Sequence, residues 1–200
     1  DRHRIRAAQR DKLELRRVLV LHLEQRQVGE LVQGDDPDLL VSLAIELAVL
    51  LGHEEDPAVI IQEGRLNREM GPNVMIKIPA TKAGLEAMNV LIAENTPINA
   101  TEVMGVSQAL EICRMYERIS HQTGKRPKIY YSLITGIYDE YLQKWVTEQG
   151  IGISSDMIYV AGLAIAKKTY EITKAHWPDI GFIGGGVRGL HHFTEMVGAD

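Results

Sequence analysis

The sequence is poor in cysteine and has no long apolar run. Its single cysteine, Cys113, cannot form an intramolecular disulfide or a zinc site of several cysteines. We therefore expect it to pack inside a protein of the reducing cytoplasm. The most apolar window, residues 39–51, is too short to span a bilayer and contains Glu46. The amino-terminal residues are charged, so we expect no signal peptide and no membrane partner.

A strong excess of positive charge is also missing. The chain has 22 lysines and arginines against 27 aspartates and glutamates, and its formal net charge is −5. Apart from an arginine-rich stretch in the first 17 residues, the basic residues are scattered. Because nucleic acids bind basic surfaces, we predict no nucleic-acid partner. A length of 200 residues suits one domain with a substantial core.

Helical and strand patterns divide the chain into a helical or irregular segment, 1–40, and an α/β domain, 41–200. Residues 1–33 have a helix-forming composition, and residues 39–51 fit either a helix or a buried strand. Short apolar runs that alternate with helices are typical of a parallel sheet. We predict strands at 73–79, 97–103, 128–134 and 180–184, and helices at 58–70, 82–94, 107–122, 138–149, 155–176 and 190–197.

Lys77 lies in the middle of an apolar, β-branched run that predicts an interior strand. Taking an ammonium group out of water disfavours its charged form and leaves more of the free amine, which can attack a carbonyl carbon. The residue therefore fits a Schiff-base lysine. The alternative is a lysine whose stem packs on the strand while its amine reaches solvent.

Polar residues interrupt the next two predicted strands. Asn99 and Thr101 share one strand face, because side chains alternate with a period of two. Inside a sheet they could bind substrate hydroxyls or a water molecule, whereas at a frayed strand end they would be ordinary loop residues. Ser132 lies among bulky apolar residues, where a lone serine can also simply be tolerated.

A glycine loop at residues 184–189 follows the last predicted strand and contains Arg188. Its backbone amides and the guanidinium would suit a phosphate or another oxyanion. Since no strand or acidic ribose ligand follows the loop, we predict no dinucleotide cofactor. His191 and His192 come next. Adjacent histidines on a helix point to different faces, and no third ligand is evident, so we predict no metal site.

Three sequence blocks resemble the transaldolase family, over roughly residues 56–200. They are Asn73 to Gly84 (NVMIKIPATKAG), Ile98 to Thr101 (INAT) followed by Ser107 to Leu110 (SQAL), and Gly184 to Arg188 (GGGVR). The resemblance implies a TIM (β/α)8 barrel of the class I aldolase type. It also implies that a lysine imine passes a three-carbon dihydroxyacetone unit between sugar phosphates, as in the pentose phosphate pathway.

The same resemblance implies roles for residues around the imine. Lys77 would be the nucleophile, and Asn99 and Ser132 would contact the substrate. Thr101 would hold the water used in proton transfer. Glu46, after a shift in the alignment, would orient that water. The implied chemistry uses no cofactor.

The expected phosphate site departs from the family. The resemblance assigns Arg188 to the phosphate of the sugar, but Ile137 stands where a second arginine is expected. We predict that His191 and His192 take the place of that arginine at the anionic end of the ketose or aldose.

The family's first two strands are not recognisable in residues 1–40, although one of them carries an aspartate used in proton transfer. The chain also ends about where an eighth strand should begin, so about five of eight strands are expected. A fragment, part of a longer protein or a decayed copy would fit this pattern. Because an unclosed parallel sheet exposes edge strands, we expect a homo-oligomer.

Two other functions stay open at this point. One is a lyase similar to fructose-6-phosphate aldolase, which releases the three-carbon product to water. The other is a non-catalytic protein that binds sugar phosphates or takes part in an assembly, which the missing strands and the missing aspartate would favour.

Overall fold

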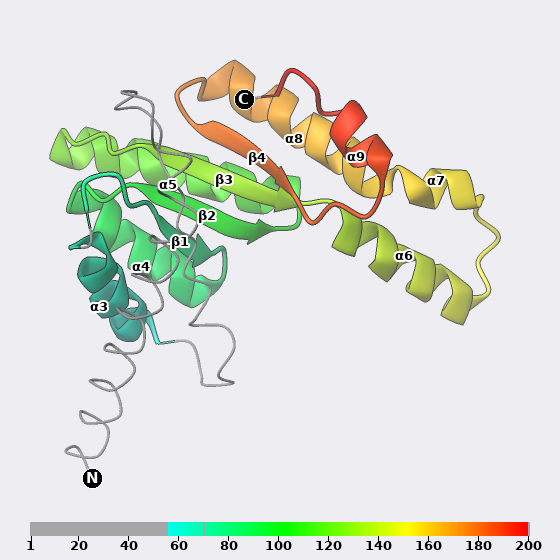
Figure 1. The fold of residues 1–200 in the computed structure, drawn as a ribbon, viewed down its shortest axis with the longest axis horizontal. Coiled ribbons are helices and arrows are strands. Elements are labelled where there is room, and N and C mark those ends of the chain that lie inside the picture. The colour runs from blue at the N-terminus through cyan, green and yellow to red at the C-terminus, as the bar shows by residue number, and fades with distance from the viewer. Residues whose placement is uncertain (1–55, 70, 200) are drawn as a thin grey trace, which may run out of the picture. The chain divides into compact units, whose positions relative to one another are not determined.

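A parallel sheet of four strands forms the centre of the computed structural model, which describes residues 56–69 and 71–199. All of these residues belong to one unit of the chain, Leu40–Asp200. The strand order is β1-β2-β3-β4, and Figure 1 shows the arrangement. The strands are β1 (Ile76–Pro79), β2 (Ile98–Val103), β3 (Ile129–Ile134) and β4 (Gly181–Gly185). The predictions for residues 1–55, including the role of Glu46, lie outside the described residues.

Helices follow each strand, as the sequence pattern predicts. Their bounds are α3 (Pro57–Arg68), α4 (Lys82–Ala93), α5 (Val106–Thr123), α6 (Gly136–Gln149), α7 (Ser155–Tyr159), α8 (Ala161–His176) and α9 (Leu190–Thr194). Several ends carry ordinary signals. The Asp56 carboxylate accepts a hydrogen bond from the Ala58 amide beside Pro57, and α5 and α6 end at left-handed glycines, Gly124 and Gly150.

The single helix predicted at 155–176 is wrong, because the chain forms two helices that meet at Val160. In a continuous helix the Gly162 amide would donate to the carbonyl four residues earlier. Here it donates to the Asp139 carboxylate of α6, at 2.6 Å. This side-chain acceptor therefore marks the start of α8.

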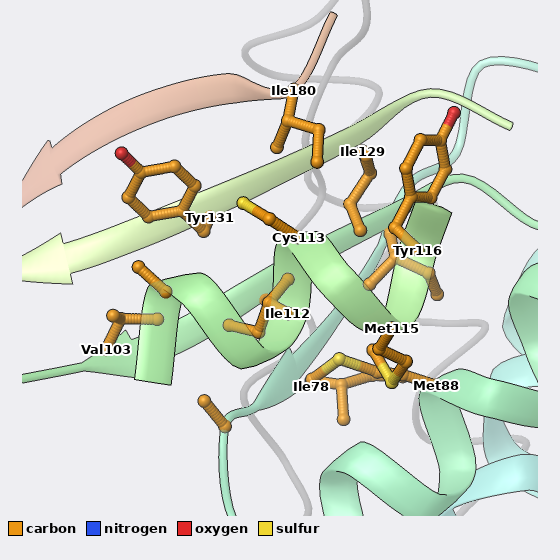
Figure 2. Close-up of a cluster of buried hydrophobic side chains, with 14 of the residues drawn as sticks. Ile78, Met88, Val103, Ile112, Cys113, Met115, Tyr116, Ile129, Tyr131 and Ile180 are labelled. Atoms are coloured by element: carbon orange, nitrogen blue, oxygen red, sulfur yellow. The ribbon is translucent and has the colours of Figure 1, made fainter. Parts of the chain in front are cut away.

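The two faces of the sheet differ in character, because side chains alternate along each strand. On one face, apolar residues of all four strands pack against α4, α5 and α8 in a continuous core. Figure 2 shows part of it, with Ile78, Ile129 and Tyr131 of the strands close to Ile112 and Met115 of α5. On the opposite face, the register pairs Lys77 with Asn99 and Pro79 with Thr101.

Cys113 lies in this core and is fully buried, which confirms its predicted packing role. Burial raises the pKa of its thiol to about 12, so the side chain stays neutral at physiological pH. Nearby, the Tyr131 and Thr173 hydroxyls form a buried hydrogen bond of 2.7 Å that joins β3 to α8.

The described strands form part of the expected architecture without completing it. Within residues 56–69 and 71–199, β1 and β4 lie at the two edges of the sheet, and Lys77 is on β1. The interior position expected for the lysine strand stays a prediction, because it depends on strands outside these residues. A closed (β/α)8 barrel stays a prediction. Among these residues no helix has the length and apolar character needed to cross a bilayer.

The contact between α4 and the sheet gives a test of the core. Leu91 is fully buried, whereas its neighbour Val90 is 37% exposed. We expect Leu91→Ala to lower the free energy of unfolding by about 2–5 kcal/mol, because it leaves a cavity. The matched change Val90→Ala should shift it by less than about 0.5 kcal/mol. Urea denaturation followed by circular dichroism measures both, and equal effects would contradict the packing described here.

Candidate functional site

The first feature of the site is the turn that follows Lys77, where β1 passes directly into α4. The Thr81 hydroxyl accepts a hydrogen bond from the Gly84 amide at 3.1 Å and so begins the helix. A Cβ atom on Gly84 would lie 1.9 Å from the Pro79 carbonyl oxygen. The turn therefore requires glycine at this point, which explains in physical terms why Thr81 and Gly84 accompany the lysine.

Lys77 is half-buried on β1. Its backbone neighbour across the sheet is Asn99, which is 4% exposed. Thr101 lies two residues further along the same face and is 7% exposed. Asn99 and Thr101 therefore belong to a buried strand, and the alternative of a frayed, polar strand end is wrong.

Ser132 joins this polar face from β3. Its hydroxyl donates to the Asn99 side-chain oxygen at 2.8 Å, and the serine is 5% exposed. This bond engages the oxygen of the Asn99 amide. The NH2 group of the same amide can donate to a substrate hydroxyl. The structure thus brings together four predicted residues: Lys77, Asn99, Thr101 and Ser132.

A β-bulge shapes the carboxyl end of β2. Ala100 pairs with Tyr131 but Val103 pairs with Leu133, so β2 has one extra residue there. Glu102 lies in this bulge and has a φ of +58°, which is unusual for a residue other than glycine. Gln108 then accepts from the Met104 amide and donates to the Ala80 carbonyl, so it ties the loops after β1 and β2 together.

Arg188 and His191 lie in the segment after β4, where they contact α6 and α7. The Arg188 guanidinium makes an ion pair with Glu140, with 2.6 Å between Nε and Oε1. This pairing with a carboxylate raises the pKa of Arg188. A Cβ atom on Gly136 would lie 2.3 Å from the Arg188 side chain, so the loop rests directly on the start of α6.

His192, and not His191, is the fully buried histidine. Its Nδ1 accepts a hydrogen bond from the Arg188 amide at 3.1 Å, and its Nε2 lies 3.0 Å from the Asp139 carboxylate. Since Nδ1 is an acceptor, the ring proton belongs on Nε2, which donates to Asp139. The Asp139 carboxylate therefore holds both the Arg188 loop and the start of α8.

The expectation that the two histidines point to different faces is wrong. Their ring centroids are 3.9 Å apart, and the ring of His191 also stacks on Tyr159. The Nε2 atom of His191 lies 3.0 Å from the Tyr159 carbonyl oxygen, while its Nδ1 is buried without a hydrogen-bond partner.

A third possible metal ligand, Asp139, lies beside the two histidines, which the sequence did not reveal. One possible ligand atom from each of Asp139, His191 and His192 lies within 4.8 Å of the other two. A metal ion on His192 Nε2 would have to displace the proton that this atom donates to Asp139 and would disturb the bond from the Arg188 amide. Hydrogen bonds already account for His192 and Asp139, so this arrangement fits a hydrogen-bonded pair better than a metal centre.

Sequence reasoning missed the partners of Arg188. Asp139 stands in the first turn of α6 and Glu140 follows it, and their pattern alone resembles an ordinary acidic helix start. The one available signal was that His192 follows Arg188 by four residues on a short helix, within reach of its backbone.

The buried histidine can be tested through stability. We expect His192→Ala to lower the free energy of unfolding by about 1–3 kcal/mol, because the Arg188 amide and the Asp139 carboxylate lose their partner. The neighbouring change His191→Ala removes a half-buried ring that stacks on Tyr159 but makes only one, exposed, hydrogen bond in the described structure, and it should cost less than about 1 kcal/mol. Denaturant titration of both variants makes the comparison. A larger loss for His191→Ala would show that the hydrogen-bonded pair is wrongly described.

Comparison with known proteins identifies a family for this chain. A family model described as Transaldolase/Fructose-6-phosphate aldolase matches residues 40–200. A transaldolase of Mycobacterium leprae is 31% identical over 139 residues, which are 64% of this chain and 36% of that protein. A probable transaldolase of Exiguobacterium sibiricum is 36% identical over 93 residues, 46% of this chain and 38% of that protein.

A probable transaldolase of a Hydrogenobaculum species is 44% identical over 55 residues, 28% of this chain and 25% of that protein. The chain thus spans between 25% and 38% of the length of these relatives. The family match itself covers most of the chain, and the residues that it includes are the sheet, its helices and the loops described above. The chain belongs to the transaldolase/fructose-6-phosphate aldolase family.

Proposed function

We propose that this protein transfers a three-carbon dihydroxyacetone unit between sugars through a Schiff base on Lys77. The observation that carries the proposal is the pairing of Lys77 with Asn99 beside a buried Ser132–Asn99 hydrogen bond. A half-buried amine, an amide and two hydroxyl groups on one face can bind a ketose and polarise its carbonyl group. The relatives named transaldolase support a transferase of this kind.

The proposed reaction begins when the Lys77 amine attacks the ketose carbonyl carbon and water leaves, which forms an imine. The bond between the third and fourth carbons then breaks. Its electron pair moves into the imine to give an enamine, while the hydroxyl on the fourth carbon loses a proton and an aldose departs. The enamine carbon attacks the aldehyde of a second aldose, and hydrolysis of the new imine regenerates Lys77.

The residues around Lys77 take separate parts in this scheme. The Asn99 amide donates to a ketose hydroxyl, and Ser132 fixes its orientation through the bond at 2.8 Å. Thr101, on the same face and almost buried, holds the water that carries the proton. In the same proposal Glu46, which lies outside the described residues, orients that water.

Borohydride trapping tests the lysine directly. Reduction in the presence of dihydroxyacetone should lock the three-carbon unit onto Lys77, which peptide mass spectrometry detects. We expect Lys77→Met to abolish the adduct, because the nucleophile is lost, while Lys82→Met, an exposed lysine at the start of α4, should leave it unchanged. An unmodified Lys77 in the parent chain, with labelling elsewhere or nowhere, would refute the proposal.

Product analysis separates the proposed transfer from the two other functions. With an aldose acceptor present, a transferase forms a new ketose, whereas a lyase releases free dihydroxyacetone with or without the acceptor. A protein that binds sugars without trapping and without turnover would be a non-catalytic binding protein.

A second variant tests the orientation of Asn99. Ser132→Ala removes the hydroxyl that fixes the amide, and we expect kcat/KM to fall by about tenfold to a hundredfold, since small misplacements of a substrate-binding group are costly. Trapping on Lys77 should persist, because the nucleophile is intact. The matched change Ser155→Ala, at an exposed serine of α7, should leave kcat/KM unaltered. Equal rates for the parent and Ser132→Ala would remove Ser132 from the site.

A further inference from the structure

The guanidinium of Arg188 is already engaged by groups of the protein itself. Its Nε donates to Glu140 Oε1 at 2.6 Å, and Nη2 donates to Oε2 at 3.4 Å. Nη1 donates to the carbonyl oxygens of Gly186 at 3.2 Å and Val187 at 3.4 Å. A carboxylate and two carbonyl groups thus occupy the fork that would otherwise bind a phosphate.

The Arg188 backbone amide is committed as well. The Arg188 amide donates to His192, whose ring is fully buried and is held in turn by Asp139. The loop also lies against Gly136 without room for a Cβ atom. Neither this amide nor a simple shift of the loop is available to an incoming anion, so the chain holds Arg188 beside Glu140.

The charges around the pair are mostly negative. Glu140 lines an open groove of about 780 Å³ between α6 and α7, whose charged lining residues are one lysine and four carboxylates: Lys144, Asp139, Glu140, Glu148 and Asp156. A phosphate dianion next to Arg188 would therefore meet repulsion from Glu140 at short range.

A sugar hydroxyl suits these groups better than a phosphate does. A hydroxyl can donate to the Glu140 carboxylate and accept from Arg188 at the same time, so it leaves the pair intact and adds no charge. Glu140 follows the carboxyl end of β3, and Arg188 follows that of β4. In parallel α/β folds of the barrel type, substrate-binding groups lie at this end of the strands.

We infer that the Glu140–Arg188 pair binds the uncharged polyol end of a ketose, and that Glu140 selects against a phosphorylated end. This inference rests on the proposed Lys77 chemistry and names its substrate class. It makes Glu140 the residue that determines specificity in the segment after β3.

The test compares fructose with fructose 6-phosphate, two ketoses that differ only at the far end. Borohydride trapping on Lys77 is measured over a range of concentrations for the parent chain, for Glu140→Gln and for Glu148→Gln. The last variant removes the same charge from α6 at a residue that pairs with Lys144. Because the two sugars differ in their open-chain fraction, the variants are compared by the ratio of the two half-saturating concentrations.

We expect Glu140→Gln to lower the half-saturating concentration of fructose 6-phosphate relative to fructose by about tenfold, equivalent to about 1.4 kcal/mol. Glu148→Gln should leave the ratio within about twofold of the parent. In the parent, inorganic phosphate at about tenfold molar excess over fructose should not weaken trapping by fructose.

Two other outcomes overturn the inference in distinguishable ways. An unchanged ratio in Glu140→Gln, or an equal change in Glu148→Gln, rejects the selective role of Glu140 while leaving the Lys77 chemistry in place. Dihydroxyacetone lacks the far carbons of fructose, so it reports on Lys77 alone. If it also forms no adduct, the proposed function itself fails, and the inference fails with it.

Discussion

The parallel register of β1, β2 and β3 is the constraint on which the site depends. Because side chains alternate, the register that places Ile76 and Ile78 against the helices places Lys77 on the opposite face beside Asn99. A slip of β1 by one residue would move the lysine into the apolar core and an isoleucine onto the polar face. Burying an unpaired ammonium is very unfavourable, so the core that stabilises the fold also fixes the position of the amine.

The turns at the carboxyl ends of β1 and β2 reinforce this register. Thr81 and Gly84 start α4 just after the strand that carries Lys77, and Gln108 joins the loops after both strands. The left-handed backbone of Glu102 costs on the order of 1–3 kcal/mol, which the surrounding contacts must offset. Such a bulge re-aims the end of β2 next to Thr101, so strain in the backbone lies where a polar side chain has to be placed.

The elements could be predicted from the sequence because their signals are local. Short apolar runs, the Asp56-Pro57 start of α3 and the glycines after α5 and α6 all act within a few residues. The break before α8 could not be predicted, since it depends on a bond between Gly162 and a carboxylate 23 residues away. The same holds for the ion pair of Arg188, whose partner is 48 residues away and becomes its neighbour only through the pairing of β3 and β4.

The two parts of the proposed site are therefore under different physical control. The groups around Lys77 lie on paired strands, where a change of position would disturb the core. Arg188 and Glu140 lie on a loop and a helix start, with side chains 44% and 60% exposed. A substitution at such an exposed carboxylate changes stability little but reverses the balance of charge next to the guanidinium. In the proposed function, the charge of the ketose's far end can thus change through single residues while the strands that hold the amine stay the same.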